Sequence, residues 1–123
     1  MILISGDRHT GELSRLDTTR EVEGGELELG YPLYELTASA ITRSQPTSFA
    51  RQLEAAAARP VVYQNEHNRH RVGDRLVYEH FGLISVDWEA KGGAVVTLAL
   101  HLDHGTEVLR QRVKLGELRA DGR

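Results

Sequence analysis

The sequence has no cysteine among its 123 residues. This absence excludes disulfide bonds, zinc sites built from thiolates and a cysteine nucleophile. The sequence also lacks an apolar run of 18 residues, which a membrane-spanning helix requires. Its first residues do not show the basic and then apolar order of a secretory signal peptide. We therefore expect neither a membrane span nor a signal peptide in this chain.

The sequence also has no excess of basic over acidic residues. The 15 Lys and Arg residues are outnumbered by 18 Asp and Glu residues, so the net charge is −3 with neutral histidines. Proteins that bind nucleic acid usually show a basic footprint, and membrane anchors are often polybasic, so neither is expected here. The hydrophobic fraction of 40% and the charged fraction of 27% are ordinary for a globular protein. The length fits one domain or part of one.

The N-terminal stretch "LISGDRH", residues 3–9, is the first candidate for chemistry. A short apolar run stopped by Gly6 predicts a strand at residues 2–5 that is buried on both faces, followed by a loop at its carboxyl end. Asp7 and His9 would then offer an oxygen and a nitrogen from one tight turn, and metals used for hydrolysis accept both. The same spacing also arises by chance, and an Asp at a strand end often caps a turn. Both readings remain open at this point.

The first two-thirds of the chain predicts a mixture of strands and one helix. Strands are expected at residues 12–17 and 31–39, with a hairpin or an acidic loop at residues 22–29. An apolar stripe at helical spacing predicts a helix at residues 48–58, which Pro60 ends. The polar residues 65–74 have no apolar period and predict a loop.

The last 45 residues predict an antiparallel meander. Strands are expected at residues 81–88, 94–102 and 106–115, and glycine-containing turns lie between them. Alternation along the middle strand places its apolar side chains on one buried face, and the same reasoning places Trp88 in or beside the core. The fold class is therefore α+β, dominated by sheet. The residues expected on the buried face of the middle strand are Val96, Leu98 and Leu100.

Four segments in order resemble the C-terminal part of the PhoD-like (alkaline phosphatase D) family of calcineurin-like metallophosphoesterases. They are "LISGDRHTGEL" at residues 3–13, "YPLYELTASAIT" at 31–42, "HNRHRVGD" at 67–74 and "HFGLISVDW" at 80–88. The ending "VKLGEL", residues 113–118, is similar to the end of that family's domain. The resemblance extends over nearly the whole chain, so residues 1–123 would form the C-terminal part of such a domain.

The resemblance implies a fold, an activity and a set of site residues. The fold would be the C-terminal portion of a two-sheet sandwich flanked by helices. The activity would be hydrolysis of phosphate monoesters or diesters with iron and calcium, or with other divalent metals. Asp7 and His9 occupy the last metal-binding block, G-D-x-H, so His9 would be a metal ligand and Asp7 a ligand or its close partner. The family also suggests a secreted or periplasmic protein, although the chain alone leaves the compartment unknown.

Other polar residues are weaker candidates. His67 and Arg71 could contact the substrate phosphate, and a guanidinium matches phosphate geometry well. The alternative, which we favour, is a surface loop with solvated side chains. His80 is expected to cap a strand, whereas His101 and His104 are expected on the surface beside a hairpin turn.

The chain departs from the family in one respect. The earlier metal-binding blocks D-x-H, G-D-x-x-D and G-N-H-D/E are missing, so the sequence offers one or two ligands only. We expect the isolated chain to be inactive and to need an N-terminal portion of the enzyme, or to self-associate through an exposed seam beside the first strand. The alternative function is a non-catalytic β-rich module, either a degenerate fragment or an interaction domain.

Overall fold

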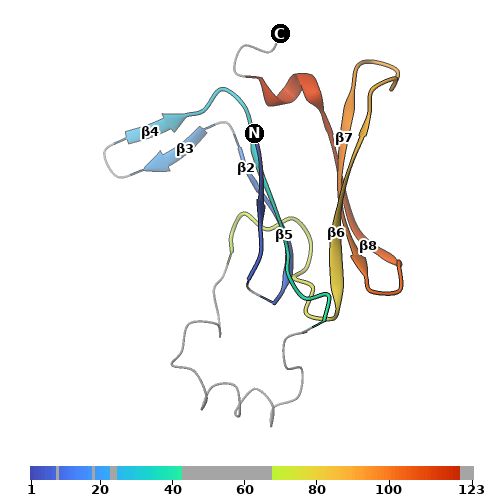
Figure 1. Ribbon diagram of the computed structural model, residues 1–123. Helices are drawn as coiled ribbons and strands as arrows, with labels where there is room; N and C mark the ends of the chain where they lie inside the picture. Colours follow the sequence, from blue (N-terminus) through green and yellow to red (C-terminus); the bar gives the residue numbers. More distant parts are fainter. Residues whose placement is uncertain (8, 18, 23–24, 43–67, 120–123) are drawn as a thin grey trace.

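The structure, a computed structural model, describes residues 1–7, 9–17, 19–22, 25–42 and 68–119. Strands dominate this part of the chain, as predicted (Figure 1). The helix predicted at residues 48–58 lies outside the described residues. Among the described ranges, no helix is both long and apolar enough to cross a membrane. The elements are β1 (Ile2–Ser5), β2 (Gly11–Leu16), β3 (Thr19–Val22), β4 (Gly25–Glu28), β5 (Leu33–Ala38), β6 (His80–Asp87), β7 (Val95–Leu102), β8 (Glu107–Lys114) and a 3₁₀ turn η1 (Leu115–Leu118).

The N-terminal sheet has the order β1-β5-β2. Strand β1 pairs with β5 in parallel, and β2 pairs with β5 in antiparallel. Alternation along β5 buries Tyr34 and Leu36 on one face, whereas Glu35 points to the other. The expected hairpin near residues 22–29 is confirmed as the antiparallel pair β3–β4.

The C-terminal sheet is the predicted meander, with the order β6-β7-β8 and antiparallel pairing throughout. Both connections turn at glycines with positive φ, which is 106° at Gly93 and 92° at Gly105. Val96, Leu98 and Leu100 are buried, so the predicted register of the middle strand is correct.

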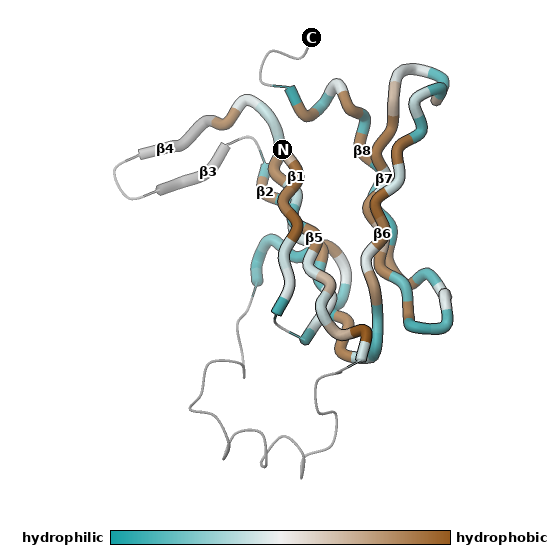
Figure 2. Tube along the Cα trace, viewed as in Figure 1, coloured by the Kyte–Doolittle hydropathy of each residue, from teal (hydrophilic) through white to brown (hydrophobic). Residues whose placement is uncertain are grey.

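The two sheets pack face to face, and their facing sides hold the core. In Figure 2 the apolar segments of both sheets lie along the space between them. Gly82 of β6 allows a close approach, because a Cβ there would lie 3.0 Å from the Cβ of Ala38 and 3.2 Å from Leu36 Cδ2. The buried cluster draws on β2, β5, β7 and β8, and consists of Leu13, Tyr34, Leu36, Val96, Leu98, Leu100 and Val113.

One side of this sandwich is closed by residues 68–76. The segment pairs with the outer edge of β2: Val72 N–H donates to the Leu13 carbonyl at 2.7 Å, and Gly11 and Leu76 exchange two hydrogen bonds of 2.8 Å. It also reaches β8, because a Cβ on Gly73 would lie 2.9 Å from a methyl carbon of Leu109. The edges of β2 and β8 therefore form what we call the closed side.

The opposite side is bounded by β1 and β6, the other edge strands of the two sheets, and we call it the open side (Figure 1). The strand predicted at residues 2–5 is confirmed, but the prediction that it is buried on both faces is wrong, since Leu3 is 44% and Ile4 is 75% exposed. Within the described residues β1 has β5 as its only neighbour, so nothing covers its other edge. The prediction that Trp88 lies in or beside the core is also wrong. Trp88 follows the end of β6 and is 71% exposed.

Truncating Leu98 should test how far stability depends on the contact between the sheets. Leu98→Ala removes a fully buried side chain (0% exposed), so we expect a loss of about 2–5 kcal/mol in the free energy of unfolding. Leu83→Ala on the outer face of β6, where the side chain is 48% exposed, is the matched control and should lose less than about 1 kcal/mol. Urea denaturation followed by circular dichroism measures both. Equal losses would contradict the assignment of the core.

Candidate functional site

The loop at the carboxyl end of β1 holds the two residues singled out by the sequence. Asp7 has a φ of 66° and His9 a φ of 54°, so both lie in the left-handed region. This conformation costs an L-residue about 1–2 kcal/mol, although Asp and His tolerate it better than most residues. Backbone strain of this kind is concentrated at functional sites. The loop is therefore the strongest candidate site in the described chain.

The residues after β5 hold this loop in place. The backbone N–H of His9 donates to Ser39 Oγ at 2.9 Å, and the hydroxyls of Ser5 and Thr37 lie 2.6 Å apart. Because β1 and β5 are parallel, their carboxyl ends meet at the same edge of the sheet, which is where α/β folds place ligands. The Ser39 hydroxyl thus accepts a hydrogen bond from the backbone of the loop.

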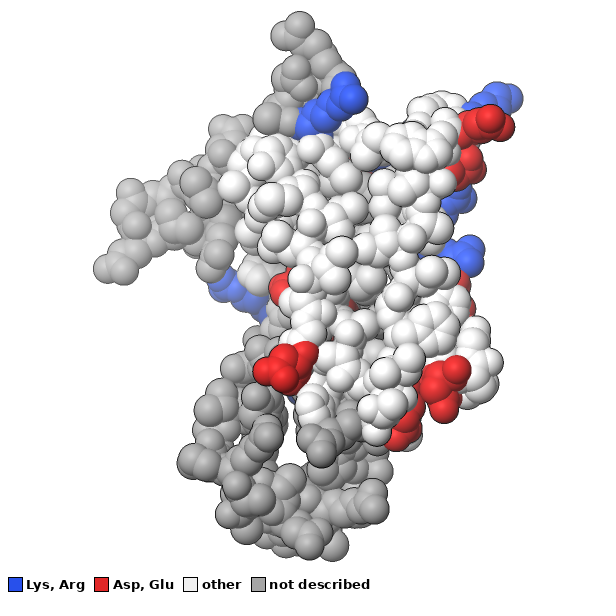
Figure 3. Space-filling model, viewed as in Figure 1, with Lys and Arg blue, Asp and Glu red and all other residues white. Residues whose placement is uncertain are grey.

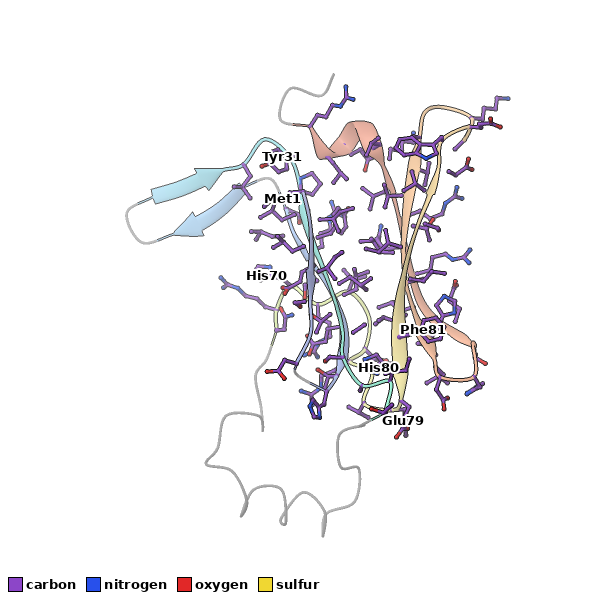
Figure 4. All side chains as sticks on the ribbon, in the orientation of Figure 1. Met1, Tyr31, His70, Glu79, His80 and Phe81 are labelled. Atoms are coloured by element: carbon purple, nitrogen blue, oxygen red, sulfur yellow. The ribbon has the colours of Figure 1, made fainter. Side chains whose placement is uncertain are left out.

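His80 supports the loop from the other sheet. Its side chain is buried, and Figure 4 shows it at the start of β6. Its Nδ1 lies 2.6 Å from the carbonyl of Tyr78, and its Nε2 accepts the backbone N–H of Ser39 at 3.3 Å. These partners place the ring proton on Nδ1, since a carbonyl can only accept. His80 does begin a strand, as expected, but the sequence held no signal for its link through Ser39 to the loop.

The side chains of the loop have donor types that suit a metal. Asp7 is exposed and His9 is half-buried, and they offer a carboxylate and an imidazole. Divalent metals in hydrolytic sites accept both donor types, so the pair fits part of a coordination sphere. The described residues contain no group of three or more His, Asp or Glu side chains that could hold a metal.

The side-chain hydrogen bonds of Arg71 are with Glu12 of β2 and not with this loop. Its guanidinium makes a two-pronged ion pair with Glu12, with Nε–Oε2 and Nη2–Oε1 distances of 3.2 and 3.3 Å. Asn68 donates to the same carboxylate at 3.2 Å and to Ser14 Oγ at 2.7 Å. These contacts fasten the closing segment to the outer face of β2. Substrate contact by Arg71 stays a prediction, and His67 lies outside the described residues.

A second Asp–His pair occurs in the β7–β8 turn and serves as a comparison. The backbone N–H and the ring of His104 contact the carboxylate of Asp103 at 2.8 and 2.9 Å, and hydrogen bonding to His104 lowers the pKa of Asp103. Both residues are exposed, as expected for His104. His101 is less exposed than predicted, because its ring stacks on Phe81 with centroids 5.2 Å apart.

No protein-family model, no curated protein and no solved structure matches this chain. The resemblance to PhoD-like phosphatases therefore stays a prediction from the quoted segments.

Removing the His80 ring should loosen the support of the loop. His80→Ala removes a buried ring and leaves the partly buried Ser39 N–H without its acceptor, so we expect a loss of about 1–3 kcal/mol in the free energy of unfolding. His104→Ala is the matched control at an exposed turn and should change stability by less than about 0.5 kcal/mol. Thermal and urea denaturation measure the difference, and similar values for both variants would argue against this support.

Relieving the strain at Asp7 should raise stability. Glycine adopts positive φ without a steric penalty, so we expect Asp7→Gly to gain up to about 1 kcal/mol in the free energy of unfolding. Asp74→Gly is the matched control, because Asp74 is exposed and its φ is not positive. That variant should lose up to about 1 kcal/mol through the added freedom of the unfolded chain. A loss at Asp7 equal to the loss at Asp74 would contradict a strained loop.

Proposed function

We propose that this chain contributes Asp7 and His9 to the metal site of a phosphoester hydrolase, as the C-terminal portion of a PhoD-like enzyme. The observation that carries the proposal is the left-handed conformation of both residues in one loop, held by Ser39 at the carboxyl edge of the N-terminal sheet. This loop presents an oxygen donor and a nitrogen donor on a fixed backbone. Metals used for hydrolysis accept both donor types.

The use of glycine elsewhere favours a functional loop over an ordinary turn. In the rest of the described chain, positive φ occurs at glycines alone. Glycine takes this conformation without strain, so a loop that only had to reverse direction would be expected to use it again. Ionisable residues stand at the two strained positions instead, which is explained if their side chains are needed. The five glycines with positive φ are Gly30, Gly73, Gly92, Gly93 and Gly105.

The chemistry of the bound metals would lie in polarising the phosphoryl oxygens and lowering the pKa of a bound water. The chain's own part is to hold two donors in position. Ser39 fixes the backbone of His9, and His80 fixes the backbone of Ser39, so the loop is supported by both sheets. Iron with calcium is the metal pair that the resemblance implies, and the remaining ligands would come from a further polypeptide segment.

A non-catalytic β-rich interaction module is the second candidate. The open side favours it, because apolar side chains are exposed there. The two candidates differ in a measurable way, since a hydrolase portion must bind metal at the loop and an interaction module need not.

Metal binding at the loop can be mapped with a paramagnetic ion. We expect Mn²⁺ titrated into ¹⁵N-labelled chain to broaden the amide signals of residues 6–10 and Ser39 first, because the effect falls steeply with distance. Asp7→Asn combined with His9→Ala should abolish this selective broadening. The isolated chain should show negligible turnover of a chromogenic phosphodiester with iron and calcium, because two ligands do not hold the paired metals of such a site.

The Asp103–His104 turn is the control within the same molecule. Asp103→Asn combined with His104→Ala should leave the broadening of the loop unchanged. If Mn²⁺ broadens the two turns equally, or if the loop variant leaves the pattern as it was, the loop is no metal site and the proposed function fails.

A further inference from the structure

The interior of the sandwich is exposed on the open side. Residues in direct register share a face of a sheet, so Ile84 and Val86 of β6 face inward with Leu98 and Val96. Yet Ile84 is 36% and Val86 is 39% exposed, whereas Leu98 is 0% exposed. Ile4 of β1 is likewise in register with buried Leu36. On the same inward face, side chains of the neighbouring strands β7 and β5 are buried, whereas these side chains of the edge strands β6 and β1 are exposed.

The two strands that bound this side are unprotected edges. Within the described residues, β1 and β6 each have one neighbouring strand. The first residue of β6 is bridged, because the His80 N–H donates to the Ala40 carbonyl at 3.1 Å, and no other described strand pairs with the rest of that edge or with the outer edge of β1. Proteins usually protect such edges with lysine, proline, a bulge or a covering segment. Residues 68–76 cover β2 on the closed side, and β8 carries Arg110, Arg112 and Lys114. Strands β1 and β6 contain no lysine, arginine or proline, and Asp87 at the end of β6 is their one carboxylate.

The open side is also almost free of charge. Figure 3 looks onto it and shows an uncharged surface across both sheets, with acidic and basic residues at its borders. A surface that is uncharged and apolar, and that ends in unpaired strand edges, fits a partner with the same properties. The net charge of the chain is −3, which gives two copies a weak mutual repulsion, and a neutral contact surface adds no like-charge contacts to it.

We propose that the open side is the interface between two copies of this chain. A two-fold axis perpendicular to the sheets would pair the β6 edges of both copies in antiparallel and bring the β1 edges together at the same time. Each three-stranded sheet would then continue into the partner's sheet, and Ile84 and Val86 would be covered by their counterparts. The surface is self-complementary in this arrangement because both sheets end on the same side.

This inference is independent of the proposed function, because the interface involves the strand edges and not the side chains of Asp7 and His9. Dimer formation can therefore fail while metal binding succeeds, and the reverse. Each result is read by a separate measurement.

Sedimentation velocity over a range of concentrations tests the proposal. We expect the unmodified chain to dimerise reversibly. Val86→Lys should raise the dissociation constant about tenfold or more, because the dimer would bury an unpaired ammonium group. Val108→Lys on β8 is the matched control, since Val108 is 45% exposed compared with 39% for Val86, and it should leave the dissociation constant unchanged. Circular dichroism checks that both variants keep the sheet content of the parent.

A second variant separates a weakened dimer from an unfolded chain, in case Val86→Lys prevents folding. Ile4→Lys changes a side chain that is 75% exposed, so the single chain should tolerate it while the dimer weakens. A parent chain that stays monomeric at the highest concentration overturns the proposal and leaves a different polypeptide as the occupant of this side. A dimer that Val108→Lys weakens as much as Val86→Lys overturns it as well, because the contact would then lie elsewhere.

Discussion

The packing of the two sheets against each other is the contact on which the rest of the molecule depends. Among the described residues neither three-stranded sheet has a second layer of its own, so each buries its apolar face against the other. A close approach occurs at Gly82, where the absence of a side chain lets β6 lie over Leu36 and Ala38. The same approach brings the ring of His80 to the backbone of Ser39. The geometry of the candidate loop is thus a product of core packing between residues that are far apart in sequence.

The two sides of the sandwich differ in whether their edge strands are covered. On the closed side, backbone pairing, the Glu12–Arg71 ion pair and the apolar contacts of Val72 and Leu76 all hold one segment in place. These are different kinds of interaction, and together they complete the core beyond β2. On the open side β1 and β6 have no equivalent in the described residues. This asymmetry explains why side chains of the same apolar type are buried at one edge and exposed at the other.

Local pattern was sufficient for the strands and for the meander. Alternation and glycine turns predicted the three C-terminal strands and the buried set Val96, Leu98 and Leu100, because hairpins join neighbours in sequence. Burial at edges was not predictable in this way, since the exposure of Ile4 and Trp88 depends on which strands lie beside them. The loop with Asp7 and His9 was found from its residue types, but its strain and its supports arise from tertiary contacts.

The pairing of β1 with β5 also has a consequence for the order in which the chain folds. Parallel partners such as Ile2 and Tyr34 are separated by a long stretch of sequence, and the cover of β2 comes from residues 68–76, further along still. Contacts of high sequence separation form slowly, because the entropy of closing the intervening loop is lost before the contacts can compensate for it. The C-terminal meander needs only two short turns. On a ribosome, however, the N-terminal strands emerge first. Their apolar face therefore stays exposed, and open to contact with other nascent chains, until β7 has been synthesised.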